Sequence, residues 1–496
     1  FAAYQATTGN NNTAVGDQSL SLMTTASDNT AVGRSSLKIN TTGTSNVAVG
    51  KDSLSLNTEG DNNTAVGKNS LYANQTADNN TAIGTASLVT NTTGFNNTAV
   101  GNSALANNTT GHDLIAVGCG ALFCNTTGPD NIAIGYQSQY NTTTGCQNVS
   151  MGWQSMAGNL TGDGNTALGF KALYTNNGST PDFNVAVGRQ ALYSTTSGYR
   201  NVGIGLNAMY TTTTGYANVG IGPNVLYSNT TGYENVAIGQ CALYANISGV
   251  ENTAIGCGAL RSSQTATANT AVGRAALGKN TSGLRNVALG RNAMCANTTA
   301  SDNVAIGFQA LCTNTTGAEN VAVGRNALFA STTGTGGNVA VGMCTAVGIT
   351  TGCFNTIIGK NAGTSLTTPE GNTFIGKSAG CNAVSGNNNT TLGINAGIDG
   401  VKNITGTDTH NIVIGNNGNT NAYIKIDWTV TSDLRDKTNI ENVPYGLNFI
   451  NQITPIKYDF KTSREDETPN GTKKYGFSAQ EILALEGDNP VIIDNH

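Results

Sequence analysis

A short motif, Ala-Val-Gly or a close variant, recurs every seventeen residues through most of the chain. Its glycines hold this spacing from Gly16 to Gly169 and again, after two extra residues, from Gly188 to Gly324. One further residue precedes the last copies, which end with a looser one at Gly415. A fixed period this short is typical of a stacked architecture, in which each copy contacts mainly its neighbours. The period therefore predicts a rod of about 24 copies.

Composition narrows the class of protein further. Charged residues make up only 11% of the chain and 63 residues are Gly, which could indicate disorder, but a disordered chain has no reason to keep Val and Leu in register. The net charge of −5, without a basic block, gives no footprint for nucleic acid. No apolar run approaches the ~20 residues that cross a bilayer. We expect a folded chain with neither nucleic-acid partner nor membrane insertion, and Phe1 in place of a start methionine predicts a processed chain or a fragment.

One copy, from Asn97 to Gly111, illustrates the expected local structure. Thr-Ala-Val at 98–100 predicts a short strand, with its first and third side chains on one face and the small alanine on the other. Leu105 predicts a second short strand, and the Asn-Thr-Thr-Gly that follows predicts a turn. About three apolar residues per copy then face inward, which is too few for a core, so copies must stack or several chains must wind together.

An asparagine stands four residues before the glycine in every copy but one, where Leu114 replaces it. An inward asparagine can form a ladder, with its amide bonded to the copies above and below. The alternative is that the residue only favours a turn before the strand. Its retention in nearly every copy exceeds what a turn demands and favours the ladder.

Aromatic residues also recur in register. Tyrosines occupy one position in five consecutive copies and a second position in three: Tyr174, Tyr193, Tyr210, Tyr227 and Tyr244, and Tyr199, Tyr216 and Tyr233. A row of exposed rings could bind sugars, but stacking of the rings along the rod is the simpler interpretation and the one we favour.

Ten cysteines are spread along the chain without a C-x-x-C pair or a His–Cys cluster, which predicts no zinc site. We expect no other metal and no cofactor. Cys295 and Cys312 share one register of adjacent copies and could approach disulfide distance, although a pair of small buried thiols is the interpretation we favour.

The strand signature is clearest at Asn131-Ile132-Ala133-Ile134-Gly135, and it resembles the head repeats of trimeric autotransporter adhesins. Those heads are left-handed β-rolls in which three chains pack around one axis. The resemblance covers residues 12–415, with a period longer than is usual for that family. It implies an all-β fold, a homotrimeric β-solenoid or β-roll fibre, with residues 1–415 as the shaft.

The composition changes after the repeats. Residues 416–431 contain an alternating apolar and polar segment that predicts one connector strand. Residues 432–496 hold seven basic and eleven acidic residues, a far denser charge than in the shaft, which predicts a small separate α+β domain. Within it we expect a helix over 479–485.

Ser432 and Lys437 stand at the start of this domain. A lysine with a lowered pKa can take the proton of a serine hydroxyl and activate the serine as a nucleophile. The spacing alone is weak evidence, because a serine and a lysine lie this close in many surface turns.

The longer pattern, Ser-Asp-x-Arg-x-Lys-x-Asn-Ile at 432–440 followed by Gly-Phe-Ser-Ala-Gln-Glu at 476–481, resembles the intramolecular chaperone domain of phage endosialidase tailspikes and related fibres. In that family the domain trimerises the preceding fibre and then cuts itself off before the motif serine. The resemblance implies cleavage after Thr431, with Ser432 as nucleophile, Lys437 as base, and Asp433 and Arg435 as supporting residues. The family's long C-terminal helices are not evident before His496, so we expect a shortened domain.

Together these features predict a viral tail fibre or tailspike shaft, a virion appendage that contacts a host cell-surface glycan or protein. The alternatives are a bacterial trimeric adhesin at the cell surface and an ice-binding solenoid, which is disfavoured because its threonines stand in turn positions. A glycan-degrading enzyme is also disfavoured, because the repeats offer no paired-carboxylate pocket. We therefore expect self-cleavage to be the only enzymatic activity.

Overall fold

The computed structural model describes residues 5, 7–176, 182–334, 336–398, 402–420, 446–461 and 469–486. The chain divides into two units, Phe1–Ile414 and Gly415–His496. Within the described ranges no helix has the length and apolar character to span a membrane.

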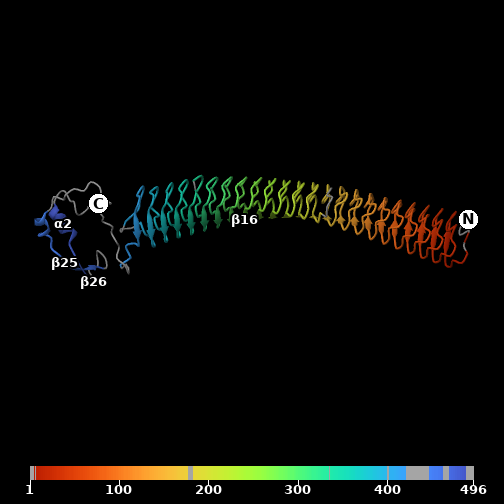
Figure 1. Cartoon of the computed structure of the whole chain (residues 1–496), viewed down its shortest axis with the longest axis horizontal. Coiled ribbons are helices and arrows are strands. Elements are labelled where there is room, and N and C mark those ends of the chain that lie inside the picture. Colours follow the sequence, from red (N-terminus) through yellow and green to blue (C-terminus); the bar gives the residue numbers. More distant parts are fainter. Residues whose placement is uncertain are drawn as a thin grey trace. The chain divides into compact units, whose positions relative to one another are not determined.

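The first unit is a β-solenoid in which each seventeen-residue copy forms one coil and contributes one strand of three residues (Figure 1). The strands form a single parallel sheet along one side of the stack. They are β1 (Thr13–Val15), β2 (Thr30–Val32), β3 (Val47–Val49), β4 (Thr64–Val66), β5 (Thr81–Ile83), β6 (Thr98–Val100), β7 (Ile115–Val117), β8 (Ile132–Ile134), β9 (Val149–Met151), β10 (Thr166–Leu168), β11 (Val185–Val187), β12 (Val202–Ile204), β13 (Val219–Ile221), β14 (Val236–Ile238), β15 (Thr253–Ile255), β16 (Thr270–Val272), β17 (Val287–Leu289), β18 (Val304–Ile306), β19 (Val321–Val323), β20 (Val339–Val341), β21 (Thr356–Ile358), β22 (Thr373–Ile375), β23 (Thr390–Leu392) and β24 (Ile412–Ile414). The predicted all-β solenoid of short repeats is confirmed.

Each strand pairs with the strand of the next coil in full register, so that Ala99 of β6 lies opposite Ala116 of β7. The register continues across both irregularities of the period. Thr166 pairs with Val185 and Val321 pairs with Val339, although extra residues separate these coils. The extra residues therefore belong to the connections and leave the sheet continuous.

The middle residue of each strand points into the solenoid. Ala305 in β18 is fully buried, whereas Ile306 beside it is 37% exposed. In most coils a leucine stands four residues after the glycine and is also buried, as is the small residue before it, for example Leu105 and Ala104. The small middle residue of the strand and the leucine thus line the interior of the solenoid. The first and third residues of the strand form the outer face of the sheet.

The second short strand predicted around the leucine is absent from the described coils, and this prediction was wrong. Leu105 has φ 53°, in the left-handed region, where no β-strand can form. Its N–H still donates to the carbonyl of Ala121 in the next coil at 3.0 Å, so it links coils as a strand residue would. A left-handed leucine costs about 1–2 kcal/mol, and burying its side chain stabilises by about 1.5–3 kcal/mol. Burial therefore offsets the strain.

The last coils fill the interior differently. From Gly359 onward glycine replaces the leucine, as at Gly363 and Gly380, and larger residues replace the middle alanine, as at Ile357 and Phe374. A side chain at Gly380 would overlap the ring of Phe374. The exchange keeps the core filled in these coils.

A polar patch interrupts the core in the coils of β8 and β9. Gln139 stands in place of the leucine and is fully buried, and its Nε2 donates to the carbonyl of Ile132 at 2.9 Å and to Ser150 Oγ at 3.0 Å. Ser138 and Ser155 are buried beside it. The buried apolar residues consequently form two clusters, one ending at residue 133 and one beginning at residue 156.

The second unit is small. Its described elements are a one-turn helix α1 (Leu447–Ile450), an antiparallel hairpin of β25 (Ile456–Lys461) and β26 (Pro469–Gly476), and helix α2 (Ala479–Glu486) (Figure 1). The predicted helix over 479–485 is confirmed as α2. Helix α1 was not predicted, because four residues are too few to show a helical apolar period.

Candidate functional surfaces and the chaperone segment

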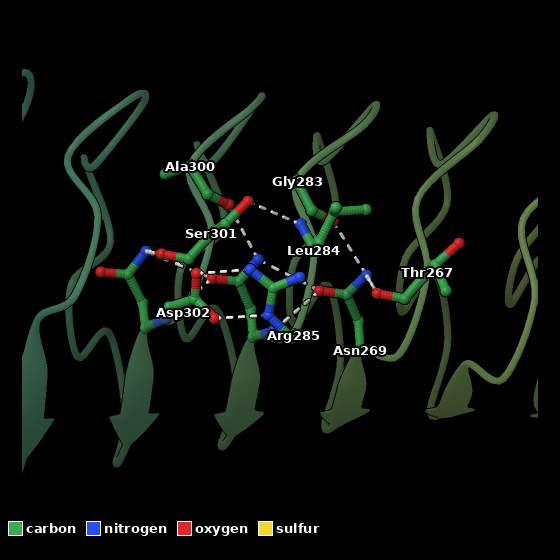
Figure 2. A network of polar contacts seen from close by, with 10 residues as sticks. Thr267, Asn269, Gly283, Leu284, Arg285, Ala300, Ser301 and Asp302 are labelled. Atoms are coloured by element: carbon green, nitrogen blue, oxygen red, sulfur yellow. Dashed lines mark hydrogen bonds and ion pairs between the residues drawn. The ribbon is translucent and has the colours of Figure 1, made fainter.

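The predicted asparagine ladder is present (Figure 2). Asn269 donates from Nδ2 to the carbonyl of Gly283 at 2.9 Å, and its Oδ1 accepts the backbone N–H of Asn286 at 3.0 Å. The Asn286 amide also donates to the same Oδ1 at 3.1 Å. Leu114 interrupts the ladder, because it offers no amide oxygen to the backbone N–H of Asn131. The ladder therefore binds the turn carbonyls inside the coils and ties successive coils together.

A second asparagine ladder was missed by the sequence analysis. Asn57 donates from Nδ2 to Asn40 Oδ1 at 2.7 Å and to the carbonyl of Gly60 at 2.9 Å. Asn74 repeats the contact to Asn57 Oδ1 at 2.8 Å. These residues open the turn that reads Asn-Thr-Thr-Gly at 40–43 and in many other coils, and turn preference alone had seemed a sufficient reason for them. Their periodic recurrence was the signal that could have identified the ladder.

The tyrosine rows are stacked, as the favoured interpretation required. Neighbouring rings in the row from Tyr174 to Tyr244 lie 4.9–5.2 Å apart and nearly parallel. In the second row Tyr216 lies 5.0 Å from Tyr199 and 4.7 Å from Tyr233. The ring faces inside each row are covered by other rings, so they present edges rather than faces to a sugar. Burial between its neighbours raises the pKa of Tyr227.

The threonine rows use their hydroxyls within the stack. Thr92 Oγ1 donates to the carbonyl of Thr109 at 3.0 Å, and Thr109 Oγ1 donates to Thr126 at 3.0 Å. Each of these hydroxyls donates its proton to the next coil, so the proton is not available to bind water at the surface. The arrangement supports a structural use of this row rather than ice binding.

The outer sheet face exposes apolar side chains along its length. In-register pairing places like residues side by side, so that Ile238 of β14 lies next to Ile221 and Ile255 of the adjacent strands. These three side chains are exposed. A continuous apolar strip on a protein surface marks a site of association.

Charged side chains pair between coils on the surface. The Arg285 guanidinium contacts the Asp302 carboxylate in the next coil at 2.7 and 2.8 Å (Figure 2). This bond and the charge of Arg285 lower the pKa of Asp302. The pair is exposed and contributes little to stability. It is a surface ion pair that links two adjacent coils.

A further group of titratable residues lies on the described surface at His112, Asp113 and Asp130, whose potential ligand atoms lie within 4.8 Å of one another. His112 Nδ1 lies 2.8 Å from Asp113 Oδ2, and the ring of Phe95 stacks on His112 at 4.7 Å. Hydrogen bonds from Asn96 and then from His112 lower the pKa of Asp113. Exposed carboxylates of this kind are common without an ion, and we assign no metal to them.

A buried carboxyl group lies beside the first irregularity of the period. Asp182 is fully buried, and its Oδ2 accepts hydrogen bonds from Asn176 at 2.7 Å and Asn165 at 3.3 Å. In other coils a backbone carbonyl accepts this hydrogen bond from the asparagine, as the Gly162 carbonyl does from Asn148. Asp182 Oδ1 has no hydrogen-bond partner. Burial raises the pKa of Asp182 more than the amide donors lower it.

The substitution Asp182→Asn should therefore stabilise the solenoid at neutral pH, because it removes a buried charge and keeps one side-chain oxygen to accept from Asn176 and Asn165. Because its folded pKa is raised, the Asp182 carboxyl makes its full contribution to stability below the unfolded pKa of about 3.9, and this contribution is lost as the pH rises through the folded pKa. We expect a gain of about 1–3 kcal/mol at pH 7, and none well below pH 4. Hydrogen exchange of the β10 and β11 amides measures it. Glu251→Gln, on an exposed side chain, should change nothing, and an equal gain at both pH values would contradict the argument.

The predicted catalytic residues fall outside the described residues. Ser432, Lys437, Asp433, Arg435 and the bond after Thr431 lie within 421–445, as does most of the connector strand. Their roles stay predictions.

The second part of the chaperone motif is described, and it begins α2. Ser478 Oγ accepts the backbone N–H of Glu481 at 3.3 Å and lies 3.2 Å from Gln480 Oε1. The Ser-x-x-Glu spacing is a helix-start signature in which the serine satisfies an otherwise unpaired N–H. Ser478 is thus a helix cap, and its hydroxyl has a structural use.

Comparison with known proteins covers this end of the chain. Residues 432–489 match the model of the family described as "Chaperone of endosialidase". No curated protein matches the chain. The match begins at Ser432, the serine that the motif singled out, and it continues through the hairpin and α2. Behind its long β-solenoid, the chain therefore carries a C-terminal segment of the chaperone-of-endosialidase family.

Proposed function

We propose that this chain is the shaft of a viral tail fibre or tailspike, assembled as a homotrimer by its C-terminal chaperone segment. The observation that carries the proposal is the order of the two parts in the sequence: a solenoid with 24 described strands precedes a chaperone-of-endosialidase segment. A long parallel sheet forms slowly, because the chain loses conformational entropy in bringing distant strands together before their contacts stabilise it. A chaperone that aligns the chains addresses that step.

The outer sheet face supports a trimer. Three identical chains carry the same apolar rows in the same register, so each chain can cover the rows of another along the whole sheet. The described part of the second unit also exposes apolar side chains, with Leu447 75% and Tyr475 76% exposed. Both units thus present surface that association would remove from water.

The proposed self-cleavage uses groups of the chain alone. Neutral Lys437 takes the hydroxyl proton of Ser432, and Ser432 Oγ attacks the carbonyl carbon of Thr431. The peptide bond breaks, the Ser432 nitrogen receives the proton, and Thr431 becomes an ester on Ser432 Oγ. Water then hydrolyses the ester and releases the segment. Release would leave the assembled shaft kinetically trapped, because the aligning part has gone.

Oligomeric state tests the proposal. Light scattering of the purified full chain should give three times the 50.7 kDa of one chain, less any released segment. Gel migration without boiling should show a slow band that boiling converts to the monomer. A clean monomer in both measurements would overturn the fibre assignment.

The alternative is a bacterial trimeric surface adhesin, which the strand signature at 131–135 favours. An antibody against the solenoid distinguishes the two. It should label purified virus particles in the proposed case and the surface of uninfected bacteria in the alternative. The host glycan or protein that a virion appendage would contact can then be sought by binding to cells.

A further inference from the structure

Two cysteines of adjacent coils are in contact. Cys295 and Cys312 follow β17 and β18 at the same position of their coils, and their Sγ atoms lie 2.7 Å apart. The Cys295 thiol also lies 3.4 Å from the carbonyl oxygen of Cys312. Neighbouring strands of a sheet are about 4.8 Å apart, and a disulfide bridges Cα atoms about 4.4–6.8 Å apart. Equivalent residues of stacked coils are therefore spaced within the range that a disulfide bridges, and the two sulfurs are already in contact.

We propose that Cys295 and Cys312 form a disulfide that joins two adjacent coils of the solenoid. Both are free thiols in the structure. The oxidant is a small-molecule disulfide. The Cys295 thiolate attacks one of its sulfurs and expels the first small thiolate, and Cys312 Sγ then attacks Cys295 Sγ, gives up its proton and expels the second. Two protein thiols become one disulfide, and the small disulfide is reduced to two thiols.

The surroundings assign the order of these steps. A hydrogen bond from the Cys312 thiol lowers the pKa of Cys295 to about 7, and Lys279 of the preceding coil adds to the effect. The same hydrogen bond and burial raise the pKa of Cys312. Cys295 is also the more exposed of the two, since Cys312 is only 7% exposed. Cys295 is therefore the thiolate that meets the oxidant, and Cys312 closes the bond.

The register explains why this pair meets while another cysteine does not. The two residues continue the position of the tyrosine row that ends at Tyr244, where side chains of successive coils touch. Cys381 occupies the same position in its own coil, but Thr364 and Ile398 stand there in the coils before and after. A cysteine in this position reacts with another only where two successive coils both carry one.

Oxidation of the full chain with oxidised glutathione tests the proposal. The thiols of Cys295 and Cys312 should both be lost, with the loss of two hydrogen masses from the part of the chain that carries them. A protease that cuts at aspartate cleaves the denatured chain at Asp302, between the two cysteines, so their fragments should stay joined until a reductant is added. In the native oxidised chain, exchange of the Ala296 amide, which donates to the Cys312 carbonyl at 3.0 Å, should be slower than in the reduced chain.

Matched variants locate the bond. Cys295→Ser and Cys312→Ser should each abolish the joined fragments, whereas Cys381→Ser should keep them. Fragments that separate without reductant, or a stable glutathione adduct on Cys295, would overturn the proposal. Neither result bears on the trimer, because the bond lies within one chain.

Discussion

The substitution Ser432→Ala should abolish the proposed release of the C-terminal segment by cleavage after Thr431. Alanine has no hydroxyl, so no ester can form with the carbonyl carbon of Thr431, and the peptide bond stays intact. The residue that follows a bond is uniquely placed to attack it, because its Oγ reaches the preceding carbonyl through a five-membered ring. Denaturing gels and intact mass should show only the uncleaved chain. Lys437→Met should likewise slow release by orders of magnitude, because the hydroxyl proton then has no base.

Two measurements separate lost chemistry from lost folding. The Ser432→Ala chain should still form the heat-sensitive trimer, because the serine is proposed to act only after assembly. Ser478→Ala removes the other motif serine, which caps α2, and should cost about 1 kcal/mol of helix stability without stopping release. Continued cleavage of the Ser432→Ala chain at the same bond would refute the assigned nucleophile.

The second large effect is expected at the glycine that ends each strand. Gly290 has φ +135°, a conformation that other residues rarely adopt, and a Cβ there would lie 2.5 Å from the carbonyl oxygen of Gly307 and 2.7 Å from its carbon. Both neighbours are backbone of the next coil, so nothing can move aside without opening the sheet. Gly290→Ala should therefore destabilise these coils by more than about 4 kcal/mol. Loss of hydrogen-exchange protection in β17 and β18 would measure it.

Gly258 supplies the matched control. Its φ is +67°, and an added Cβ would meet no atom within 4 Å. The same position in the neighbouring coils holds Cys241 and Ala275, both at φ 55°. Gly258→Ala should therefore cost no more than about 1 kcal/mol. Equal effects of the two substitutions would show that glycine is needed for flexibility in general and not for the close approach of successive coils.

Much of the shaft could be predicted from the sequence, because the period determines which residues of adjacent coils lie next to each other. Once residue 269 is known to stack on residue 286, the asparagine ladder follows from the chemistry of two amides in register. It was harder to predict which face of the strand is buried. Valine and isoleucine lie outside and alanine lies inside, which reverses the usual order of hydrophobicity. The interior of so narrow a coil has room for alanine, and that limit of space is absent from the sequence. The left-handed leucines were missed for the same reason, because only burial in the completed stack offsets their strain.

The proposed cleavage site depends on a different kind of argument. The pair Ser432 and Lys437 would not have been singled out by spacing alone, because many surface turns place these residue types close together. The longer motif identified it through a resemblance, and the family match that begins at Ser432 bears out the resemblance without assigning the residue a role. The helix start at Ser478 could be predicted outright, since its capping is local.

The polar patch around Gln139 affects where the shaft unfolds first. In a linear array, cooperativity passes only through the contact between one coil and the next. Where buried serines and a glutamine replace alanine and leucine, that contact loses apolar area. The asparagine ladder still crosses the gap, with the Asn148 backbone N–H donating to Asn131 Oδ1 at 3.0 Å. We therefore expect the solenoid to open first at this patch, so that unfolding on one side can stop there and leave the coils beyond it folded.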